Sequence, residues 1–294
     1  MTNRQSILVT GASGQLGQSI QSIATQYPQF QFSFASRGQL DLASSASVAD
    51  FFKEQRFDAI INCAAYTAVD KAEQETVLAD LLNHKAVKQL AEIAKQNDTL
   101  LIHISTDYVF SGNTCKPYSE SDETQPMSVY GDSKLNGEKA IIASGCKALI
   151  IRTAWLYSEF GQNFMKTMLR LGQEREQLAI IFDQIGTPTY AVDLAGAILE
   201  MLNKKRVQNV SDNKAQIYHY SNEGVASWYD FAKAIFTLSD IDCKLEPIET
   251  KDYPTPAERP QYSLLNKQKI KHDFQLHIPY WRDSLAVCLQ NNKK

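Results

Sequence analysis

Residues 7–17, ILVTGASGQLG, join a short apolar run to a turn with three glycines, and a helical pattern continues from Gly14 to Thr25. An apolar run rich in β-branched residues is typical of a buried strand. Glycines in such a turn allow a tight bend, close approach of a pyrophosphate to backbone N–H groups, and close packing of helix on strand. The order of strand, turn and helix therefore predicts a dinucleotide-binding unit. Its expected cofactor contacts are Gly11, Ser13, Gly14, Gln15, Leu16 and Gly17.

Strand-like and helix-like segments alternate through the first half of the chain. The expected strands are Ile7–Thr10, Phe30–Phe34, Ala59–Asn62, Leu100–Ser105 and Ala148–Arg152. The expected helices between them are Gly14–Thr25, Val48–Gln55, Thr76–Gln96 and Ser133–Ala143. Apolar strands separated by helices indicate a parallel sheet that is covered on both faces. The predicted fold class is α/β, with a doubly wound, Rossmann-type parallel sheet.

The pattern is looser after Arg152. The expected elements there are the helix Asn163–Arg170, the strand Ala179–Phe182, and the helices Val192–Leu202 and Ser227–Leu238, followed by a proline-rich loop. We therefore expect an NAD(P)-binding domain over residues 1–152. Residues 153–294 are expected to form mainly a smaller substrate-binding lobe, with segments that return to the main sheet. The tail, residues 291–294, is expected to be unstructured.

Composition excludes several classes of protein. The 294 residues are 44% hydrophobic and 21% charged, as in globular domains. The net charge of -3 offers no electrostatic footprint for nucleic acid or an anionic membrane, so neither partner is expected. Five cysteines at irregular spacing suggest neither a disulfide framework nor a CxxC site. Because no apolar run precedes the first strand and none approaches the ~18 residues of a membrane span, a cytoplasmic location is expected.

The end of the second expected strand bears on the choice of cofactor. An acidic residue there would bind the ribose 2′-hydroxyl of NAD, but no Asp or Glu occurs between Gln31 and Leu40. Ser36 and Arg37 could instead bind a 2′-phosphate, so NADPH is the expected reductant, with NADH as a possible second one. Arg37 as an ordinary surface residue is the alternative. The expected cofactor contacts in this region are Ser36, Arg37, Asp41 and Leu42.

Tyr130 and Lys134 stand four residues apart, which places a phenol and an ammonium on one helix face. A cation beside a tyrosine lowers the pKa of the phenol from ~10 and lets it exchange protons near neutral pH. About one such pair is expected by chance, and Tyr229 and Lys233 form a second one. Tyr130 differs because it follows Ser105-Thr106-Asp107, at the carboxyl end of an expected parallel strand, where open α/β sheets bind ligands.

Several ordered blocks resemble one known family. They are STDYVFSG at 105–112, PYSE at 117–120, VYGDSKLNGEKA at 129–140, CAAYTAVDKAE at 63–73, RTAWLY at 152–157, NFMKTMLRL at 163–171, DQIGTPT at 183–189 and YPTPAERPQYS at 253–263. Together with the GxxGxxG spacing of the first turn, these blocks resemble the dTDP-4-dehydrorhamnose reductases, a branch of the extended short-chain dehydrogenases/reductases. The resemblance covers nearly the whole chain and implies a domain for NAD(P)H and a lobe for a dTDP-sugar.

The family's catalytic triad falls on Thr106, Tyr130 and Lys134. The resemblance implies that hydride from the nicotinamide attacks the C4 ketone of dTDP-4-dehydro-6-deoxy-L-mannose, giving dTDP-L-rhamnose for cell-surface polysaccharide. Tyr130 is then the proton donor, Thr106 hydrogen-bonds the same oxygen, and Lys134 holds the nicotinamide ribose and depresses the pKa of the phenol.

Other positions carry narrower expectations. Ala64, Ala65 and Tyr66 are expected along the cofactor. The expected substrate contacts are Val69, Asp70, Thr106, Asp107, Tyr108, Trp155, Asn163 and Arg259. Trp155 offers a flat apolar face for a hexose or nicotinamide, or else is a half-buried structural residue. Arg259 is the best local cation for the substrate diphosphate, or else a surface residue of the proline-rich loop.

No metal site is expected. The five histidines do not cluster with cysteines or carboxylates at ligand spacing. Some members of the resembled family bind Mg²⁺ at a dimer contact through a glutamate near the first turn and acidic residues after a GxPT segment. Here those places hold Ser19 and a lone Asp193. Because a hard cation needs several oxygen ligands, we expect a monomer or a homodimer that needs no metal.

Two alternative functions remain at this stage. A sister reductase of opposite face selectivity would give dTDP-6-deoxy-L-talose, since motifs do not record how the sugar sits. A regulatory subunit of the same fold would bind a partner without catalysis, and the intact Thr106, Tyr130 and Lys134 argue against it.

Overall fold

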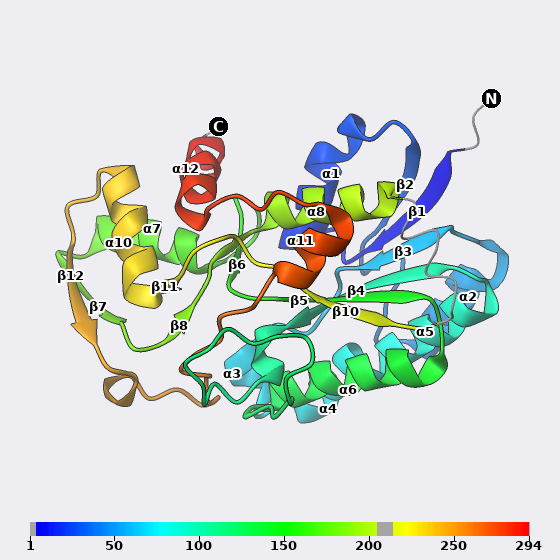
Figure 1. Ribbon diagram of the computed structural model, residues 1–294, viewed down its shortest axis with the longest axis horizontal. Helices are drawn as coiled ribbons and strands as arrows, with labels where there is room; N and C mark the ends of the chain where they lie inside the picture. The colour runs from blue at the N-terminus through cyan, green and yellow to red at the C-terminus, as the bar shows by residue number, and fades with distance from the viewer. Residues whose placement is uncertain (1–3, 205–213, 294) are drawn as a thin grey trace.

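A sheet of six parallel strands lies at the centre of the computed structural model, which describes residues 4–204 and 214–293 (Figure 1). Its strand order is β2-β1-β3-β4-β5-β10. The strands are β1 Gln5–Thr10, β2 Phe30–Ala35, β3 Ala59–Asn62, β4 Leu100–Thr106, β5 Ala148–Thr153 and β10 Gln216–His219. The predicted doubly wound α/β fold is therefore confirmed.

Alternate residues of each strand supply two separate cores. Ile7 and Val9 of β1 pack on one face of the sheet, whereas Leu8 packs on the other. Helices α1 (Gln15–Ile23), α8 (Ala191–Asn203) and α11 (Gln268–Phe274) cover the first face. Helices α2 (Ser45–Glu54), α5 (Ala86–Gln96) and α6 (Val129–Ser144) cover the second. Since side chains point to both faces in turn, strands covered on both sides must be largely apolar, as the inner strands β3, β4 and β5 are.

Several expected helices differ from the observed ones: α2 begins three residues early and α7 ends four residues late, and two others differ for reasons that the structure shows. Residues 76–96 form α4 (Thr76–Asp80), a π-helical turn η2 (Leu81–Lys85) and α5, where one continuous helix was predicted. The π turn places Asn83 so that its side chain bonds both backbone groups of Tyr66, a tertiary contact that no local pattern records. Helix α6 begins at Val129, four residues before the predicted Ser133, because the Ser128 hydroxyl accepts from the N–H of Gly131.

A smaller lobe lies beside the sheet, on the left of Figure 1. Helices α7 (Phe164–Glu174), α10 (Trp228–Ser239) and α12 (Trp281–Asn292) share an apolar core with the parallel pair β7 (Gln177–Ile181) and β12 (Lys244–Ile248). The expected unstructured tail is wrong for residues 291 and 292, which belong to α12, because Cys288 and Leu289 anchor this helix in the core. Lys294 lies outside the described residues.

Several short elements complete the described part of the chain. They are α3 Val69–Ala72, β6 Leu156–Tyr157, β8 Ile185–Gly186, β9 Thr189–Tyr190, β11 Ala226–Ser227 and the single turns η1 Ala24–Gln26, η3 Asp107–Val109 and η4 Thr250–Asp252. Although α8 and β10 follow residue 152, α8 packs on α1 and β10 extends the main sheet. The domain division at residue 152 stays a prediction. Among the described residues, no helix is long and apolar enough to cross a membrane.

Candidate active site

A cleft of about 680 Å³ opens at the carboxyl ends of the parallel strands. Most of the residues predicted from sequence line it: Gly11, Ser13, Gly14, Gln15, Leu16, Arg37, Asp41, Leu42, Ala64, Ala65, Val69, Thr106, Asp107, Tyr108, Tyr130, Lys134, Trp155 and Asn163. Five do not line it: Gly17, Ser36, Tyr66, Asp70 and Arg259. Strand ends that meet at one edge of the sheet explain why segments so distant in sequence share one cleft.

The first turn leaves the beginning of α1 open to this cleft. Gly14 is the N-cap of α1, and no side chain caps the helix. The first backbone N–H groups thus face a cleft that can accept an anion, which fits the pyrophosphate of a dinucleotide. Gly11 has a φ of +63°, and a Cβ there would lie 2.7 Å from the nitrogen of Ala64, so only glycine fits. Gly17 packs on the backbone of Gly11 and Ala12 and has no place in the cleft wall.

The residues proposed to select the cofactor lie at different places. The Arg37 side chain is 80% exposed, and its Nε lies 3.5 Å from Asp41 Oδ1. Ser36 donates its hydroxyl to Gln39 Oε1 at 3.0 Å and lies outside the cleft lining. Arg37 is therefore free to turn toward a 2′-phosphate, whereas Ser36 is engaged elsewhere.

Tyr130, Thr106 and Lys134 meet at the centre of the cleft. The Tyr130 phenol lies beside the Thr106 side chain, and the Tyr108 ring meets the Tyr130 ring edge-on at 5.5 Å. The Thr106 hydroxyl donates to Asp107 Oδ1 at 3.0 Å. Gly131 makes this approach possible, because a Cβ there would lie 2.3 Å from the carbonyl oxygen of Tyr108. The start of α6 is thus pressed against the turn after β4, which brings the phenol to the threonine hydroxyl.

Burial dominates the ionisation of the cleft. It raises the pKa of Tyr130 to about 12, with the nearby Thr106 hydroxyl opposing the rise and Asp107 adding to it. Burial likewise raises the pKa of Asp107 to about 6. It lowers the pKa of Lys134 to about 8, against an opposing effect of Glu138. In this structure the phenol is therefore protonated at neutral pH, as a proton donor must be. The depression of its pKa expected from Lys134 is not found, because burial raises that pKa and also lowers the pKa of Lys134.

Trp155 is held tightly at the edge of the cleft. Its ring stacks on Trp228 with centroids 3.7 Å apart, so one face is already covered. Its φ of +47° is a left-handed conformation that is rare for a bulky side chain and signals strain. Trp155 therefore lines the cleft, as expected of a ligand contact, and also packs on Trp228, as expected of a structural residue.

Asp70 and Arg259 bind each other outside the cleft lining. The Arg259 guanidinium donates to both carboxylate oxygens of Asp70, at 3.0 and 2.8 Å. This pairing lowers the pKa of Asp70. Arg259 also lines a separate groove of about 390 Å³, together with Gln184 and Tyr253. Because the pair joins α3 to the proline-rich loop, it links the two parts of the molecule.

Several cleft residues escaped the sequence reasoning. Cys63, Thr67, Thr153, Gly161 and Gln162 line the cleft as well. The Gln15 Oε1 atom accepts from Ser158 Oγ at 3.0 Å and from Asn163 Nδ2 at 2.9 Å, which ties the first turn to the smaller lobe. His103 and Asn62 lie next to the cleft residue Lys134, in the strands β4 and β3. The sequence could have indicated them, because each is a polar residue in an otherwise apolar run.

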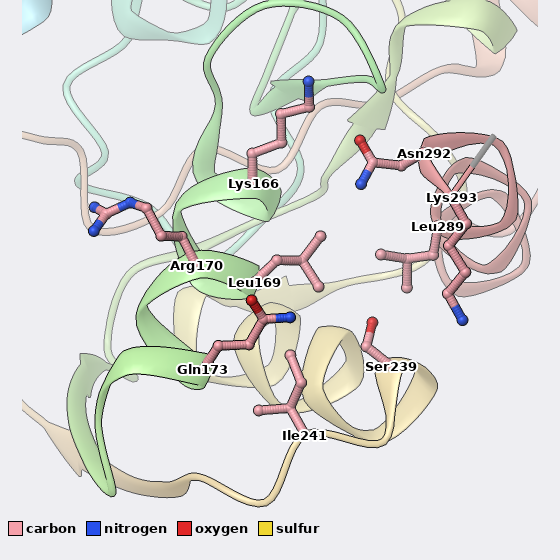
Figure 2. A pocket seen from close by; sticks show the side chains of 9 residues that line it. All are labelled: Lys166, Leu169, Arg170, Gln173, Ser239, Ile241, Leu289, Asn292 and Lys293. Atoms are coloured by element: carbon pink, nitrogen blue, oxygen red, sulfur yellow. The ribbon is translucent and has the colours of Figure 1, made fainter.

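A further cavity, of about 400 Å³, lies in the smaller lobe (Figure 2). Figure 2 shows Leu169 on α7 facing Leu289 of α12 across this cavity, whereas the side chain of Arg170 points away from α12. None of the residues predicted for catalysis or cofactor binding lines it.

The described residues contain no group of three or more His, Cys, Asp or Glu side chains that could hold a metal. The two positions at which a Mg²⁺ ligand was considered, Ser19 and Asp193, have other partners. Ser19 donates to the carbonyl of Gln15, and Asp193 accepts from Asn222 and Ser284.

Known proteins place the chain in a family. The model of the RmlD substrate binding domain matches residues 5–294. A dTDP-4-dehydrorhamnose reductase from Escherichia coli K12 is 42% identical over 288 residues, which is 94% of each chain. A crystal structure of such a reductase from Clostridium acetobutylicum has a TM-score of 0.91 at 39% identity and covers 98% of this chain and 100% of its own. One from Bacillus anthracis, in complex with NADP, has a TM-score of 0.90 at 35% identity, with the same coverage. From the cleft, the fold and these matches together, the chain belongs to the dTDP-4-dehydrorhamnose reductase family of oxidoreductases.

Proposed function

We propose that the protein reduces the C4 ketone of dTDP-4-dehydro-6-deoxy-L-mannose with NADPH and so forms dTDP-L-rhamnose. The observation that carries the proposal is the meeting of Tyr130, Thr106 and Lys134 in the same cleft as the uncapped start of α1. A dinucleotide on α1 would extend along this cleft toward the phenol. A nicotinamide, when bound there, supplies the hydride.

The chain's own residues would handle the proton. Tyr130 is protonated at neutral pH and would donate its phenolic proton to the C4 oxygen as negative charge develops on it. The Thr106 hydroxyl, which lies beside the phenol, would hold the same oxygen. Lys134 would hold the nicotinamide ribose from the side of α6. Thr106 and Lys134 are only 4% and 2% exposed to solvent. Because little water reaches them, each of these electrostatic interactions is stronger than it would be in water.

The substrate is proposed to reach this centre from the side of α3 and the proline-rich loop. Val69, Asp107, Tyr108 and Asn163 line the cleft and would contact the sugar. Arg259 would bind the diphosphate, and because it is paired with Asp70, the diphosphate would have to compete with that carboxylate. The product would serve as a donor for cell-surface polysaccharide.

The direct test supplies the 4-keto-6-deoxy-L-sugar nucleotide with NADPH and identifies the product by NMR. The rhamnose configuration at C4 supports the proposal. The talose configuration would show a sister reductase, and no consumption of NADPH would contradict the proposed activity.

Arg37 provides the test of the cofactor. Because only NADPH carries the 2′-phosphate, Arg37→Ala is expected to raise the KM for NADPH about 10-fold or more and to leave that for NADH nearly unchanged. Arg56→Ala, which removes another arginine with no part in the cleft, is the matched control. Equal losses with both cofactors would show that Arg37 does not bind the phosphate.

A further inference from the structure

Three polar side chains form a ladder across the second face of the sheet, directly behind the cleft. Thr10 of β1 pairs in register with Asn62 of β3, and Asn62 pairs with His103 of β4. All three are at most 1% exposed. Their neighbours two residues earlier, Leu8 and Leu101 among them, are core residues of the same face. Because buried polar groups are costly in an apolar core, three of them in register call for a reason.

Hydrogen bonds run along this ladder in one direction. The Thr10 hydroxyl donates to Asn62 Oδ1 at 2.7 Å, which leaves the Asn62 amide NH₂ facing His103 Nδ1 at 3.1 Å. His103 Nδ1 then accepts this bond, so the proton of the neutral imidazole is on Nε2. The imidazole is neutral because burial, the largest cause, holds the pKa of His103 well below its usual range.

The ladder ends at Lys134. His103 Nε2 lies 3.4 Å from Lys134 Nζ, and this amine also donates to the carbonyl of Ile104 at 2.5 Å. We propose that His103 is a positioning residue for Lys134: held by Asn62 and Thr10, its Nε2–H donates to the lysine nitrogen and favours the uncharged amine. This inference rests on the proposed function, in which Lys134 serves the cofactor and Tyr130.

The direction of the last bond determines its effect. An uncharged amine has a lone pair that can accept from Nε2–H, whereas an ammonium presents only donors to it. His103 therefore acts in the same direction as burial, which already lowers the pKa of Lys134 to about 8. Lys134 can then exchange a proton near neutral pH instead of remaining permanently charged.

Other ionisable groups surround the amine from each packed element. Glu138 and Tyr130 belong to its own helix, α6, and Glu138 is bound by Arg152 of β5. Asp107 follows β4, and Cys63, which follows β3, lines the same cleft. Of these, only Glu138 raises the pKa of Lys134, and Arg152 neutralises that carboxylate. The experiment therefore changes His103 and leaves this group of charges intact.

The test titrates Lys134 directly in the full-length chain without sugar. Lysine labelled with ¹³C at Cε is followed by NMR, and Lys134→Met identifies the signal. His103→Phe keeps an aromatic ring at this position but removes Nε2–H. The pKa of Lys134 is therefore expected to rise by about one unit, which corresponds to the loss of one hydrogen bond. His103→Gln restores an amide donor and is expected to bring the value back toward that of the wild type.

Two further variants keep the test decisive. His219→Phe removes an equally buried imidazole from β10 of the same sheet and is expected to leave the titration of Lys134 unchanged. Asn62→Leu keeps His103 but removes the amide that fixes its tautomer, so it should also raise the pKa, and it serves if His103→Phe does not fold.

A fall or no change in the pKa of Lys134 in the folded variants would overturn the proposal, since an imidazole that accepts from an ammonium would give a fall. The pH profile of kcat/KM for the keto sugar should show the same upward shift as the titration. If the wild type fails to reduce that sugar, the proposed function is wrong, while the titration still decides the role of His103.

Discussion

Tyr130 owes its protonation state to its surroundings. Burial raises the pKa of the phenol to about 12, so the ligand-free protein holds it as an acid throughout the physiological range. A phenol that is always protonated can donate in the direction of reduction without first capturing a proton. Lys134, the cation that the sequence places beside this phenol, is itself buried, and burial lowers its pKa to about 8.

Tyr130→Phe is expected to lower kcat by about 10² or more and to leave NADPH affinity nearly unchanged, because a positioned proton donor typically contributes 10² to 10⁴. Stopped-flow turnover and NADPH fluorescence measure the two quantities. Tyr229→Phe, in the second tyrosine–lysine pair of the chain, is the matched control and should turn over normally. A Tyr130→Phe variant with turnover near that of the wild type would contradict the assigned role.

Helix α6 is joined to the sheet by a buried ion pair as well as by apolar contacts. Glu138 accepts from Arg152 of β5 through both carboxylate oxygens and from the Ser105 hydroxyl of β4. Both charged side chains are at most 3% exposed. Since Tyr130 and Lys134 lie on the same helix, this pair sets the distance of the catalytic residues from the strand ends.

Glu138→Gln is expected to lower the free energy of unfolding by about 3 kcal/mol or more, because it leaves the buried Arg152 charge without its counterion. Urea denaturation followed by circular dichroism measures the change. Glu174→Gln, in the exposed pair with Arg170 on α7, should change it by less than about 1 kcal/mol. Similar small losses in both variants would show that the buried pair contributes little.

The two parts of the molecule meet around the cleft through a few polar contacts. Gln15 of α1 binds Ser158 and Asn163, and Asp70 of α3 binds Arg259. Asp193, the lone acid after the GTPT segment, is occupied inside the fold by Asn222 and Ser284. Assembly through a shared cation at this place would have to break those bonds.

We therefore expect activity and oligomeric state to be independent of Mg²⁺, with the chain a monomer or a dimer formed through another surface. Dialysis against EDTA, followed by an activity assay and light scattering, measures both properties; the untreated protein is the control. Activity that is lost with the chelator and returns with Mg²⁺, or a dimer that dissociates on chelation, would contradict this expectation.

Local sequence patterns were sufficient to predict the fold class of this protein. The strand, glycine turn and helix at residues 7–17 and the alternation of apolar strands with helices depend on neighbours a few residues apart, and the α/β fold was predicted from them. The family was predicted from the resemblance of longer ordered blocks, such as residues 105–112 and 129–140. The parallel order of the strands then places their ends together, which is why most predicted residues share one cleft.

Only the tertiary structure decided the contacts between distant segments. Asp70 and Arg259 bind each other although they are 189 residues apart. The local sequence around either residue gives no indication of the other. In the sequence His103 is one of five histidines that form no cluster. In the structure, the register of β3 and β4 places it between Asn62 and Lys134. Periodicity reports which face a side chain takes but not what lies opposite it, so partners of buried polar groups and their ionisation follow from packing alone.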